Sequence, residues 1–341
     1  MAALVPRLPR VPDAETLARH VPAIDPVPAG TPRPLWSVMI PTYNCDAYLR
    51  IALASVIEQD PGSPAMQIEV IDDCSTRGDP AAVAREIGRG RVAFHCNERN
   101  LGVTGTFNTC LRRATGRWIH VLHADDAVLP GFYAAYQRVI ETGDDLAMVI
   151  GQVVVIDEHG RWGNVMGPAP PVHGHVLQDF TCRQAVRHLG QFAGWVMRRD
   201  VLERVGGFST LFQHTADWDL AFRIGLAGPV GCVPRAWGCY RVHGGSDTGR
   251  LMVSGTNIYE RALVTRLCLS RLDAAACAQA RATWRRELAK VAQGAAWTLD
   301  AAGSTEGRVN QARWAFALEP TPYRALLLAL SWLKHARGRR G

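Results

Sequence analysis

The sequence predicts an α/β protein built around a mainly parallel sheet. Between residues 36 and 140, short apolar runs alternate with stretches of helical spacing, and polar residues cluster where each run ends. Strands and helices that alternate in this way are typical of βαβ units. The composition is that of a globular protein, since 48% of the 341 residues are hydrophobic and 20% are charged.

Four apolar runs and the helical stretches that follow them define the expected first half of the sheet. The expected strands span 37–40, 67–71, 91–95 and 118–122, and the expected helices span 47–58, 80–87 and 103–114, with a fourth beginning near Pro130. Proline suits the first turn of a helix because its missing N–H group would have no partner there.

The second half of the chain is less regular. It predicts strands over 148–156 and 192–197, a turn at 157–160, a loop over 163–175, and helices over 199–205 and 217–226. From residue 258 onward the chain is rich in Ala, Leu and Arg and is expected to be helical, with breaks near Gly303 and at 320–322. Residues 1–34 contain eight prolines and predict an extended arm without regular structure, because proline supplies no backbone donor.

Charge and cysteine content exclude several classes of protein. The chain carries 38 Lys+Arg against 31 Asp+Glu, a net charge of +7, but no module that interleaves basic and aromatic residues to bind nucleic acid. Its nine cysteines include no C-x-x-C pair, which predicts neither a disulfide framework nor a zinc site and favours a reducing, cytoplasmic location. No apolar run reaches the roughly 18–20 residues that span a bilayer. No apolar stretch follows Arg7 and Arg10, so no secretory signal is expected.

Paired carboxylates follow two of the predicted strands. Asp125 and Asp126 come after the fourth strand, and hard divalent cations prefer such oxygen ligands, although an N-cap of the next helix is the alternative. Asp72 and Asp73 come after the second strand, where one carboxylate could accept an N–H from a base or a ribose hydroxyl. The alternative there is an Asx-turn with Ser75.

Further candidates lie at other loops. Tyr43, after the first strand, offers an aromatic face to a planar base, or is simply half-buried. Because ligands bind beyond the carboxyl ends of parallel strands, we expect Tyr43, Asp73, Asn100 and Asp125 to share one rim of the sheet. The chain contains no P-loop, no dinucleotide-binding glycine motif, no G-x-S-x-G elbow and no H-E-x-x-H motif.

Two candidates come from the second half of the chain. Asp217 lies at the start of a predicted helix, where the helix dipole alone favours a carboxylate. His243 lies in a glycine-rich loop and is either a metal ligand or a solvated histidine.

Eight segments, in this order, resemble family 2 glycosyltransferases of the GT-A fold. They cover roughly residues 36–247 and are 37–44 (SVMIPTYN), 69–75 (EVIDDCS), 97–103 (NERNLGV), 114–119 (ATGRWI), 123–126 (HADD) with 130–132 (PGF), 205–208 (VGGF), 216–220 (ADWDL) and 240–243 (YRVH). The resemblance implies a Rossmann-like, mainly parallel sheet flanked by helices. It also implies three parts: the Pro-rich arm 1–34, a catalytic domain 35–250 with a nucleotide-binding half (35–130) and an acceptor half (131–250), and a helical extension 251–341.

The resemblance also assigns roles to individual positions. Asp217 matches the catalytic base, and Asp126 and His243 match positions that hold Mg²⁺ or Mn²⁺. The positions that match nucleotide-binding residues are Pro41, Tyr43, Asn44, Asp73, Asn100, Gly102 and Asp125. Two positions depart from the pattern, because His123 stands where the family often has Asp and Ala216 stands where Glu often precedes the base.

The implied activity is the inverting transfer of a sugar from a nucleotide diphosphate-sugar to an acceptor hydroxyl, in polysaccharide, glycolipid or glycosylated-metabolite biosynthesis. UDP is favoured as the nucleotide, with dTDP second and GDP third, because uracil and thymine present the same edge to Tyr43 and Asp73. Two alternatives are a sugar-phosphate nucleotidyltransferase and a catalytically silent scaffold that binds a nucleotide or carbohydrate.

The acceptor is a sugar, a lipid-linked molecule or a small molecule. Trp162, Trp195 and Phe212 are candidate sugar-stacking surfaces, with core packing as the alternative for each. Residues 323–340 combine apolar side chains with a basic end and are too short to span a membrane. They could lie on a membrane surface and meet a lipid-linked acceptor, or form a terminal helix packed on the catalytic domain.

Overall fold

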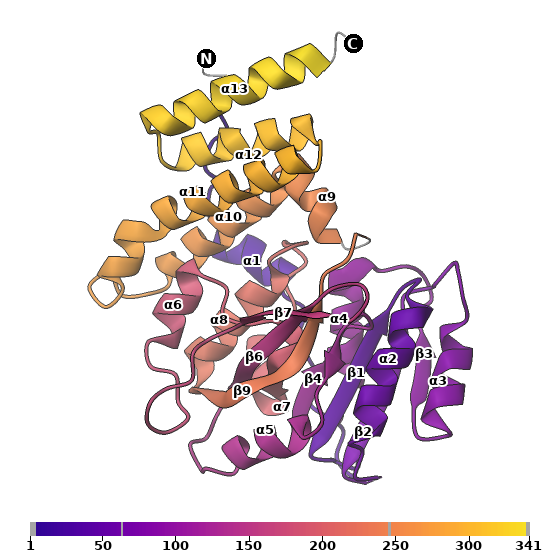
Figure 1. Ribbon diagram of the computed structural model, residues 1–341. Coiled ribbons are helices and arrows are strands. Elements are labelled where there is room, and N and C mark those ends of the chain that lie inside the picture. The colour runs from indigo at the N-terminus through magenta and orange to yellow at the C-terminus, as the bar shows by residue number, and fades with distance from the viewer. Residues whose placement is uncertain (1–4, 63, 245–246, 339–341) are drawn as a thin grey trace. The chain divides into compact units, whose positions relative to one another are not determined.

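The computed structural model describes residues 5–62, 64–244 and 247–338 and divides the chain into two units. The larger unit consists of Leu17–Thr181 and Leu189–His243. The smaller unit consists of Met1–Thr16, Cys182–His188 and Gly244–Gly341. Figure 1 shows that the sheet belongs to the larger unit and that the smaller unit is helical.

A curled sheet of nine strands forms the centre of the larger unit, in the order β3-β2-β1-β4-β8-β6-β9-β5, with β7 paired to β6. The strands are β1 (Trp36–Thr42), β2 (Met66–Asp72), β3 (Ala93–Cys96), β4 (Trp118–Val121), β5 (Ala127–Val128), β6 (Met148–Ile156), β7 (Trp162–Met166), β8 (Trp195–Arg198) and β9 (Val230–Arg241). The α/β class that the sequence predicts is therefore confirmed.

The expected parallel pairing holds for the four strands β1 to β4, which are joined through helices. Beyond β4 the sheet is mixed, because β8 runs antiparallel to both β4 and β6 while β9 runs parallel to β6. Parallel neighbours place their carboxyl ends at one edge, so the loops after β1, β2 and β4 meet there.

Three expectations for the second half of the sheet are wrong. The predicted loop 163–175 begins with the edge strand β7, and β9 forms where no strand was expected. The predicted strand 192–197 starts as a short 3₁₀ helix, Phe192–Gly194, before β8. All five side chains of β7 are exposed, so its strand conformation comes from pairing with β6 rather than from an apolar pattern.

Helices flank the sheet of the larger unit (Figure 1). They are α2 (Asp46–Ile57), α3 (Pro80–Gly88), α4 (Gly102–Arg113), α5 (Phe132–Ile140), α7 (Arg199–Val205) and α8 (Ala216–Ala227), while α1 (Ala14–His20) and α6 (Phe180–Val186) contain residues of both units. Val38 and Ile40 of β1 share the main hydrophobic cluster with Leu53 of α2 and Phe132 of α5, so the core fixes the strands whose ends carry the polar loops.

The N-terminal segment is not without regular structure, contrary to the expectation for residues 1–34. Helix α1 forms between Pro12 and Pro22, where the chain contains no proline, and the Asp13 carboxylate accepts a hydrogen bond from the Thr16 N–H group at 2.8 Å. Asp13 thus pairs one of the backbone donors that a helix start leaves open. The prediction was wrong because it used the proline content of the whole segment and not that of the short run between Pro12 and Pro22.

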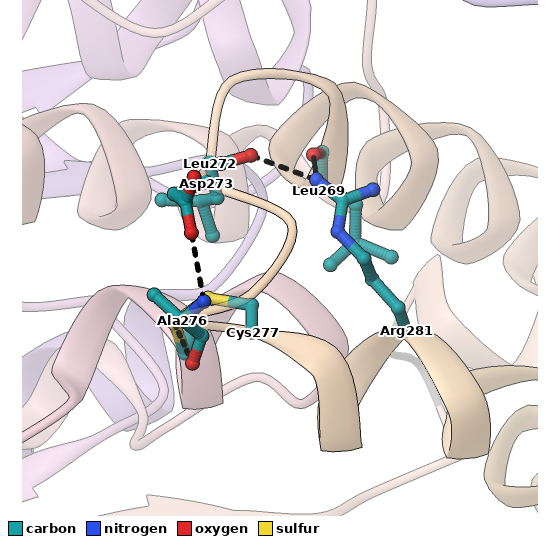
Figure 2. Close-up of a disulfide and its surroundings, with 7 residues drawn as sticks. Leu269, Leu272, Asp273, Ala276, Cys277 and Arg281 are labelled. Carbon is teal, nitrogen blue, oxygen red and sulfur yellow. Dashed lines mark hydrogen bonds between the residues drawn. A yellow bond between two sulfur atoms is a disulfide. The ribbon is translucent and has the colours of Figure 1, made fainter.

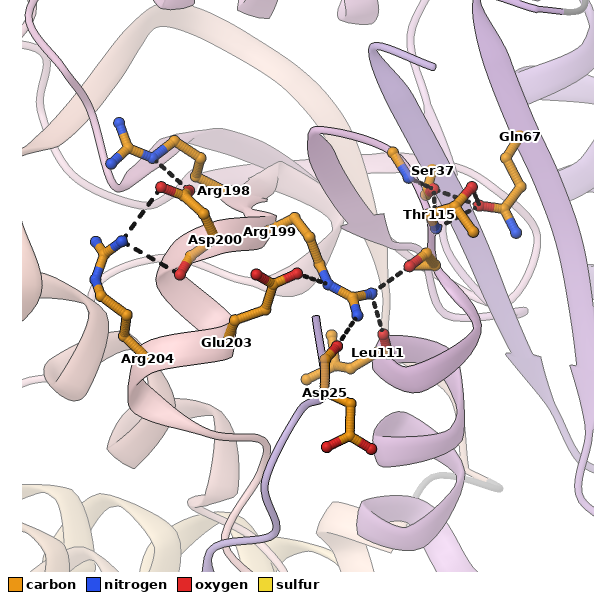
Figure 3. Close-up of polar contacts among 12 residues, drawn as sticks. Asp25, Ser37, Gln67, Leu111, Thr115, Arg198, Arg199, Asp200, Glu203 and Arg204 are labelled. Carbon is orange, nitrogen blue, oxygen red and sulfur yellow. Dashed lines mark hydrogen bonds and ion pairs between the residues drawn. The ribbon is translucent and has the colours of Figure 1, made fainter. Parts of the chain in front are cut away.

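Arg199, the first residue of α7, is almost fully buried and connects three segments of the larger unit (Figure 3). Its guanidinium donates to the carbonyl oxygens of Leu111 at 2.8 Å, of Asp25 at 2.7 Å and of Ala114, and its Nε bonds Glu203 at 3.0 Å. Its charge is therefore compensated by one carboxylate and by carbonyl groups at the end of α4.

Arg199→Ala should destabilise the protein by about 3–5 kcal/mol, the usual cost of breaking a buried charge pair. The variant leaves Glu203 and the three carbonyl oxygens without their buried donor. Urea denaturation measures the change in the free energy of unfolding. Arg204→Ala is the control, because Arg204 is exposed and pairs only through Asp200, so its loss should stay within about 0.5 kcal/mol. Equal losses in the two variants would contradict this account.

The smaller unit contains the helices α9 (Asp247–Ser254), α10 (Thr256–Ser270), α11 (Ala278–Ala301), α12 (Thr305–Leu318) and α13 (Pro322–Gly338). This confirms the expected helical extension and its breaks near Gly303 and at 320–322, whereas the break at 271–277 between α10 and α11 was not expected. Gly303 has a φ of +79°, a left-handed conformation that suits glycine and ends α11. Among the described residues, no helix is both long enough and apolar enough to cross a membrane.

A disulfide joins Cys182 of α6 to Cys277, at the start of α11, contrary to the expectation that the cysteines form no disulfide framework (Figure 2). The loop before Cys277 is held locally, since Asp273 accepts from the Ala276 N–H group at 2.8 Å and Arg281 donates to the carbonyl oxygens of Leu272 and Leu269. The two cysteines are 95 residues apart, and such a pairing leaves no signal in local spacing.

Candidate functional site

The loop after β4 gathers three groups that could hold a metal ion. Possible ligand atoms of His123, Asp125 and Asp126 all lie within 4.8 Å of one another. The loop is held against β1: the Leu122 N–H group bonds the Met39 carbonyl at 3.0 Å, and the Ala124 N–H group bonds that of Pro41 at 3.3 Å. Pro41 itself is buried in β1, so its main chain positions this loop.

Asp126 provides the strongest sign that this cluster binds a cation. Its side chain is 1% exposed, and its Oδ1 accepts from the Arg241 N–H group at 2.9 Å, but its buried Oδ2 has no hydrogen-bond partner among the described residues. Burial raises the pKa of this carboxyl well above its ordinary value, and the neighbouring Asp125 charge adds to the shift. A buried carboxylate oxygen without a partner is costly, and a bound cation would remove the cost.

His123 adds a nitrogen ligand to the same cluster. Its ring stacks on Phe107 at 5.0 Å between centroids and lies 4.9 Å from that of Phe192. Its buried Nε2 has no hydrogen-bond partner among the described residues, and burial lowers the pKa of the imidazole, which favours the neutral, ligating form. These residues fit a divalent cation that accepts both oxygen and nitrogen ligands.

Arg241 and His243, at the end of β9, close the cluster on its other side. His243 Nε2 lies 3.0 Å from Asp125 Oδ2, so His243 contacts Asp125. The Arg241 Nε donates to the Asp125 carbonyl at 2.8 Å, and its guanidinium lies 4.6 Å from the ring centroid of Tyr48. The Tyr48 ring is also 5.2 Å from that of His243, so α2 and β9 together orient the His243 imidazole.

Asp73 organises the loops after β2 and β3. Its carboxylate is 4% exposed and accepts from Asn97 Nδ2 at 2.8 Å and from the N–H groups of Leu101 at 2.8 Å and Gly102 at 2.9 Å. Asn100 Nδ2 donates to the Asp73 carbonyl at 3.0 Å. Gly102 has a φ of +72° with open space where a side chain would point, so backbone conformation rather than crowding favours glycine there.

The side chains of Asn44 and Asp72 form hydrogen bonds with the loop that follows β2. Asn44, at a φ of +52°, accepts with its Oδ1 from the N–H groups of Thr76 at 2.8 Å and Arg77 at 2.9 Å. Asp72 accepts from the Ser75 hydroxyl at 2.6 Å and from its N–H group, which is the Asx-turn considered as an alternative. Both side chains therefore hold the loops after β1 and β2 in place, beside the half-exposed ring of Tyr43.

The two carboxylates at the start of α8 differ. Asp219 is buried and pairs with Arg223 at 2.8 Å, and Arg223 also bonds the carbonyl oxygens of Val205 and Gly207. Asp217 is partly exposed, and its charge acts on the His123 imidazole, raising the pKa that burial lowers. Asp217 is thus within electrostatic reach of the cluster, while Asp219 belongs to the fold.

Several residues around the site were not singled out from the sequence. His123 was treated as a variant position, although its place two residues before Asp125 at a strand end was a usable signal. Tyr48, Phe107 and Phe192 gave no local signal, because their contacts with the site come from distant segments. Of the candidate sugar-stacking residues, Trp195 and Phe212 are each 1% exposed and belong to the core, whereas Trp162 is 67% exposed.

Comparison with known proteins identifies the family. Residues 37–206 match the model described as glycosyl transferase family 2. An uncharacterized Mycobacterium tuberculosis protein, MT1568, is 29% identical over 263 residues, which is 74% of this chain and 81% of that protein. The PGL/p-HBAD biosynthesis glycosyltransferase of Mycobacterium bovis BCG is 26% identical over 194 residues, or 56% of this chain and 69% of that one. The chain belongs to glycosyltransferase family 2 and is a glycosyltransferase.

Solved structures support the fold. The crystal structure of S. aureus TarS 1–349 in complex with UDP-GlcNAc superposes with a TM-score of 0.59 at 17% identity and covers 88% of this chain and 92% of that one. The fold is therefore GT-A.

Proposed function

We propose that this glycosyltransferase moves a sugar from a nucleotide diphosphate-sugar to an acceptor hydroxyl with inversion at the anomeric carbon. The observation that carries the proposal is the cluster of His123, Asp125 and Asp126, in which buried ligand atoms of His123 and Asp126 have no hydrogen-bond partner among the described residues. Such a cluster, beyond the carboxyl ends of β1, β2 and β4, suits a divalent cation beside a diphosphate.

Asp126 and His243 would hold Mg²⁺ or Mn²⁺ near the diphosphate, with His123 as a further ligand from the same cluster and Asp125 binding the ribose. The bound cation would offset the negative charge that develops on the departing nucleoside diphosphate. Arg241 keeps Asp125 and Asp126 in place, because it donates to the main chain of the first and the carboxylate of the second. Preformed contacts of this kind avoid reorganisation during the reaction.

Asp217 is proposed to be the general base. A carboxylate at this position would take the proton from the acceptor hydroxyl as its oxygen attacks the anomeric carbon from the face opposite the leaving group. A single displacement inverts the configuration and needs no second nucleophilic carboxylate. Asp219 cannot share the role, because its carboxylate is buried against Arg223.

The nucleotide is proposed to be UDP, with dTDP second and GDP third. The exposed Tyr43 ring offers a stacking face, and Asp73 lies at the base of the adjoining loop with Asn100 and Gly102. A carboxylate there can accept the single imide N–H group that uracil and thymine share. Asn44 and Pro41 would act by positioning these loops.

The acceptor class remains part of the proposal. A polysaccharide, glycolipid or glycosylated metabolite would place a sugar, lipid-linked or small-molecule hydroxyl near Asp217, and the similarity to a PGL/p-HBAD biosynthesis glycosyltransferase supports this range. A cytoplasmic location, with peripheral membrane contact through 323–340, is proposed with it. The seven free cysteines among the described residues favour that location, while the Cys182–Cys277 disulfide counts against a fully reducing one.

Donor choice can be tested by competition among nucleotides. We expect UDP to protect the enzyme against thermal unfolding in the presence of Mn²⁺ more strongly than GDP, with dTDP between them, because GDP lacks the uracil edge. Tyr43→Ala should weaken UDP binding by about 1–3 kcal/mol, the range measured for a stacked base. Hydrolysis of a panel of nucleotide sugars then identifies the sugar. Tighter binding of GDP than of UDP would contradict the proposal, and release of pyrophosphate would indicate a nucleotidyltransferase.

A further inference from the structure

Helix α13 presents an apolar stripe on its outer surface. Tyr323, Leu326, Leu330 and Leu333 are between 47% and 56% exposed, and their spacing of three, four and three residues aligns them along one side of the helix. Ala325 and Ala329 are exposed beside these residues. Among the described residues of this face, the charged side chain is that of Lys334.

The opposite side of α13 packs on α12 and combines the buried Leu327 with two buried polar side chains. Ser331 is buried, accepting from Arg308 Nε of α12 at 2.9 Å and donating to the Leu327 carbonyl at 2.6 Å. Arg324, also buried, pairs with Glu319. A surface helix normally buries its apolar side and exposes its polar side. In α13 the polar groups Arg324 and Ser331 face inward together with Leu327, while four large apolar groups face outward.

The charged residues in the sequence of this segment all have one sign. Residues 320–341 include Arg324, Lys334, Arg337, Arg339 and Arg340 and no Asp or Glu. Lys334 pairs with Asp300 at 2.6 Å, yet its side chain stays 51% exposed. Four of these five basic residues follow Leu333 in the sequence.

We propose that the α13 stripe lies in the headgroup region of a membrane that contains anionic lipids. Interfacial helices combine an apolar face that enters the boundary of the acyl chains with basic residues that meet anionic headgroups. This proposal deepens the proposed function, because it places the enzyme at the surface where a lipid-linked acceptor is found.

A second copy of the chain fits the stripe less well. A helix of 17 residues is about 25 Å long and about 10 Å wide, so its face offers far less than the roughly 800 Å² that each partner contributes to a stable interface. Parallel pairing of two α13 helices would also bring their basic ends together. Antiparallel pairing would set each basic end against a segment whose nearest carboxylate, Glu319, is already paired with Arg324.

Vesicle sedimentation of the full chain tests this interaction without using catalysis. We expect the protein to bind vesicles of phosphatidylcholine with phosphatidylglycerol at least about tenfold more strongly than vesicles of phosphatidylcholine alone, and high salt to reduce the binding. Leu326→Ser combined with Leu330→Ser should weaken binding to the anionic vesicles by at least about tenfold, because two apolar side chains no longer enter the lipid.

Val291→Ser on α11 is the matched control, since Val291 is another exposed apolar residue of the smaller unit, 42% exposed, and should leave binding unchanged. Melting temperatures of all variants confirm that they are folded. Equal binding by the double variant and the parent would overturn the proposal, as would equal binding to neutral and anionic vesicles. Light scattering measures the oligomeric state. A dimer that Leu326→Ser converts to a monomer, together with no vesicle binding, would assign the stripe to self-association. Vesicle binding is also measured for Asp217→Asn. Binding equal to that of the parent would show that membrane attachment does not depend on whether Asp217 is the catalytic base.

Discussion

Replacing Asp217 with Asn should reduce turnover by about 10²–10⁴-fold, the usual contribution of a general base. Asparagine has nearly the same shape but cannot take a proton from the acceptor hydroxyl. This change keeps the ligand groups of His123, Asp125 and Asp126 and removes one charge that raises the pKa of the His123 imidazole, so binding of UDP and of the nucleotide sugar should remain close to that of the parent. Steady-state kinetics give the loss of turnover, and calorimetric titration with UDP gives the binding.

Asp219→Asn is the matched control, two residues further along α8. Asp219 pairs with the buried Arg223, so its replacement should lower the melting temperature while the folded fraction retains turnover. Asp217→Asn should show the opposite pattern, with little change in melting temperature. Full turnover in Asp217→Asn would rule out Asp217 as the base.

Asp126→Asn should lower turnover by about 10²–10³-fold, the range for losing one preorganised electrostatic contact, and should abolish stabilisation by Mn²⁺. In the parent, a cation at a hundred times its dissociation constant stabilises the folded state by about 2.7 kcal/mol. Thermal unfolding with and without MnCl₂ measures this effect, and EDTA should remove both the stabilisation and the activity. Asp200→Asn, a surface carboxylate paired with Arg198 and Arg204, should leave both unchanged.

Stabilisation by Mn²⁺ should also depend on pH with a definite sign. Burial and the Asp125 charge raise the pKa of Asp126, so the proton on its carboxyl competes with the cation up to a higher pH than for an ordinary Asp. The increase in melting temperature on adding Mn²⁺ should therefore grow as pH rises through this raised pKa and shrink as pH falls. Stabilisation that is constant across this range, or full activity in EDTA, would contradict a cation bound by Asp126.

The parallel half of the fold was accessible from the sequence because each of its strands is an apolar run. In β1, for example, every residue from Trp36 to Thr42 is buried, and the loop after it begins at Tyr43. Local pattern failed where structure depends on distant partners. The side chains of β7 are all exposed and its conformation comes from pairing with β6, and α1 forms in a segment whose overall proline content argues against a helix.

In the candidate site, too, local sequence pattern predicted some features, whereas others depend on contacts between distant segments. Asp73, Asp125 and Asp126 stand at strand ends, so their position on one rim could be inferred from chain order. What Asp73 does in the loop, as the acceptor for the N–H groups of Leu101 and Gly102, depends on how the chain turns after β3. The link of His243 to Asp125 joins residues 118 positions apart, and no local pattern encodes such a distance.

A crystal structure of the protein with UDP and Mn²⁺, measured at a wavelength where manganese scatters anomalously, tests the central claim most directly. The account predicts a single strong anomalous peak at coordination distance from Asp126 Oδ2, with the diphosphate on its open side and the uracil against Tyr43. A manganese ion bound away from the His123–Asp126 loop, or UDP bound at another surface, would contradict it.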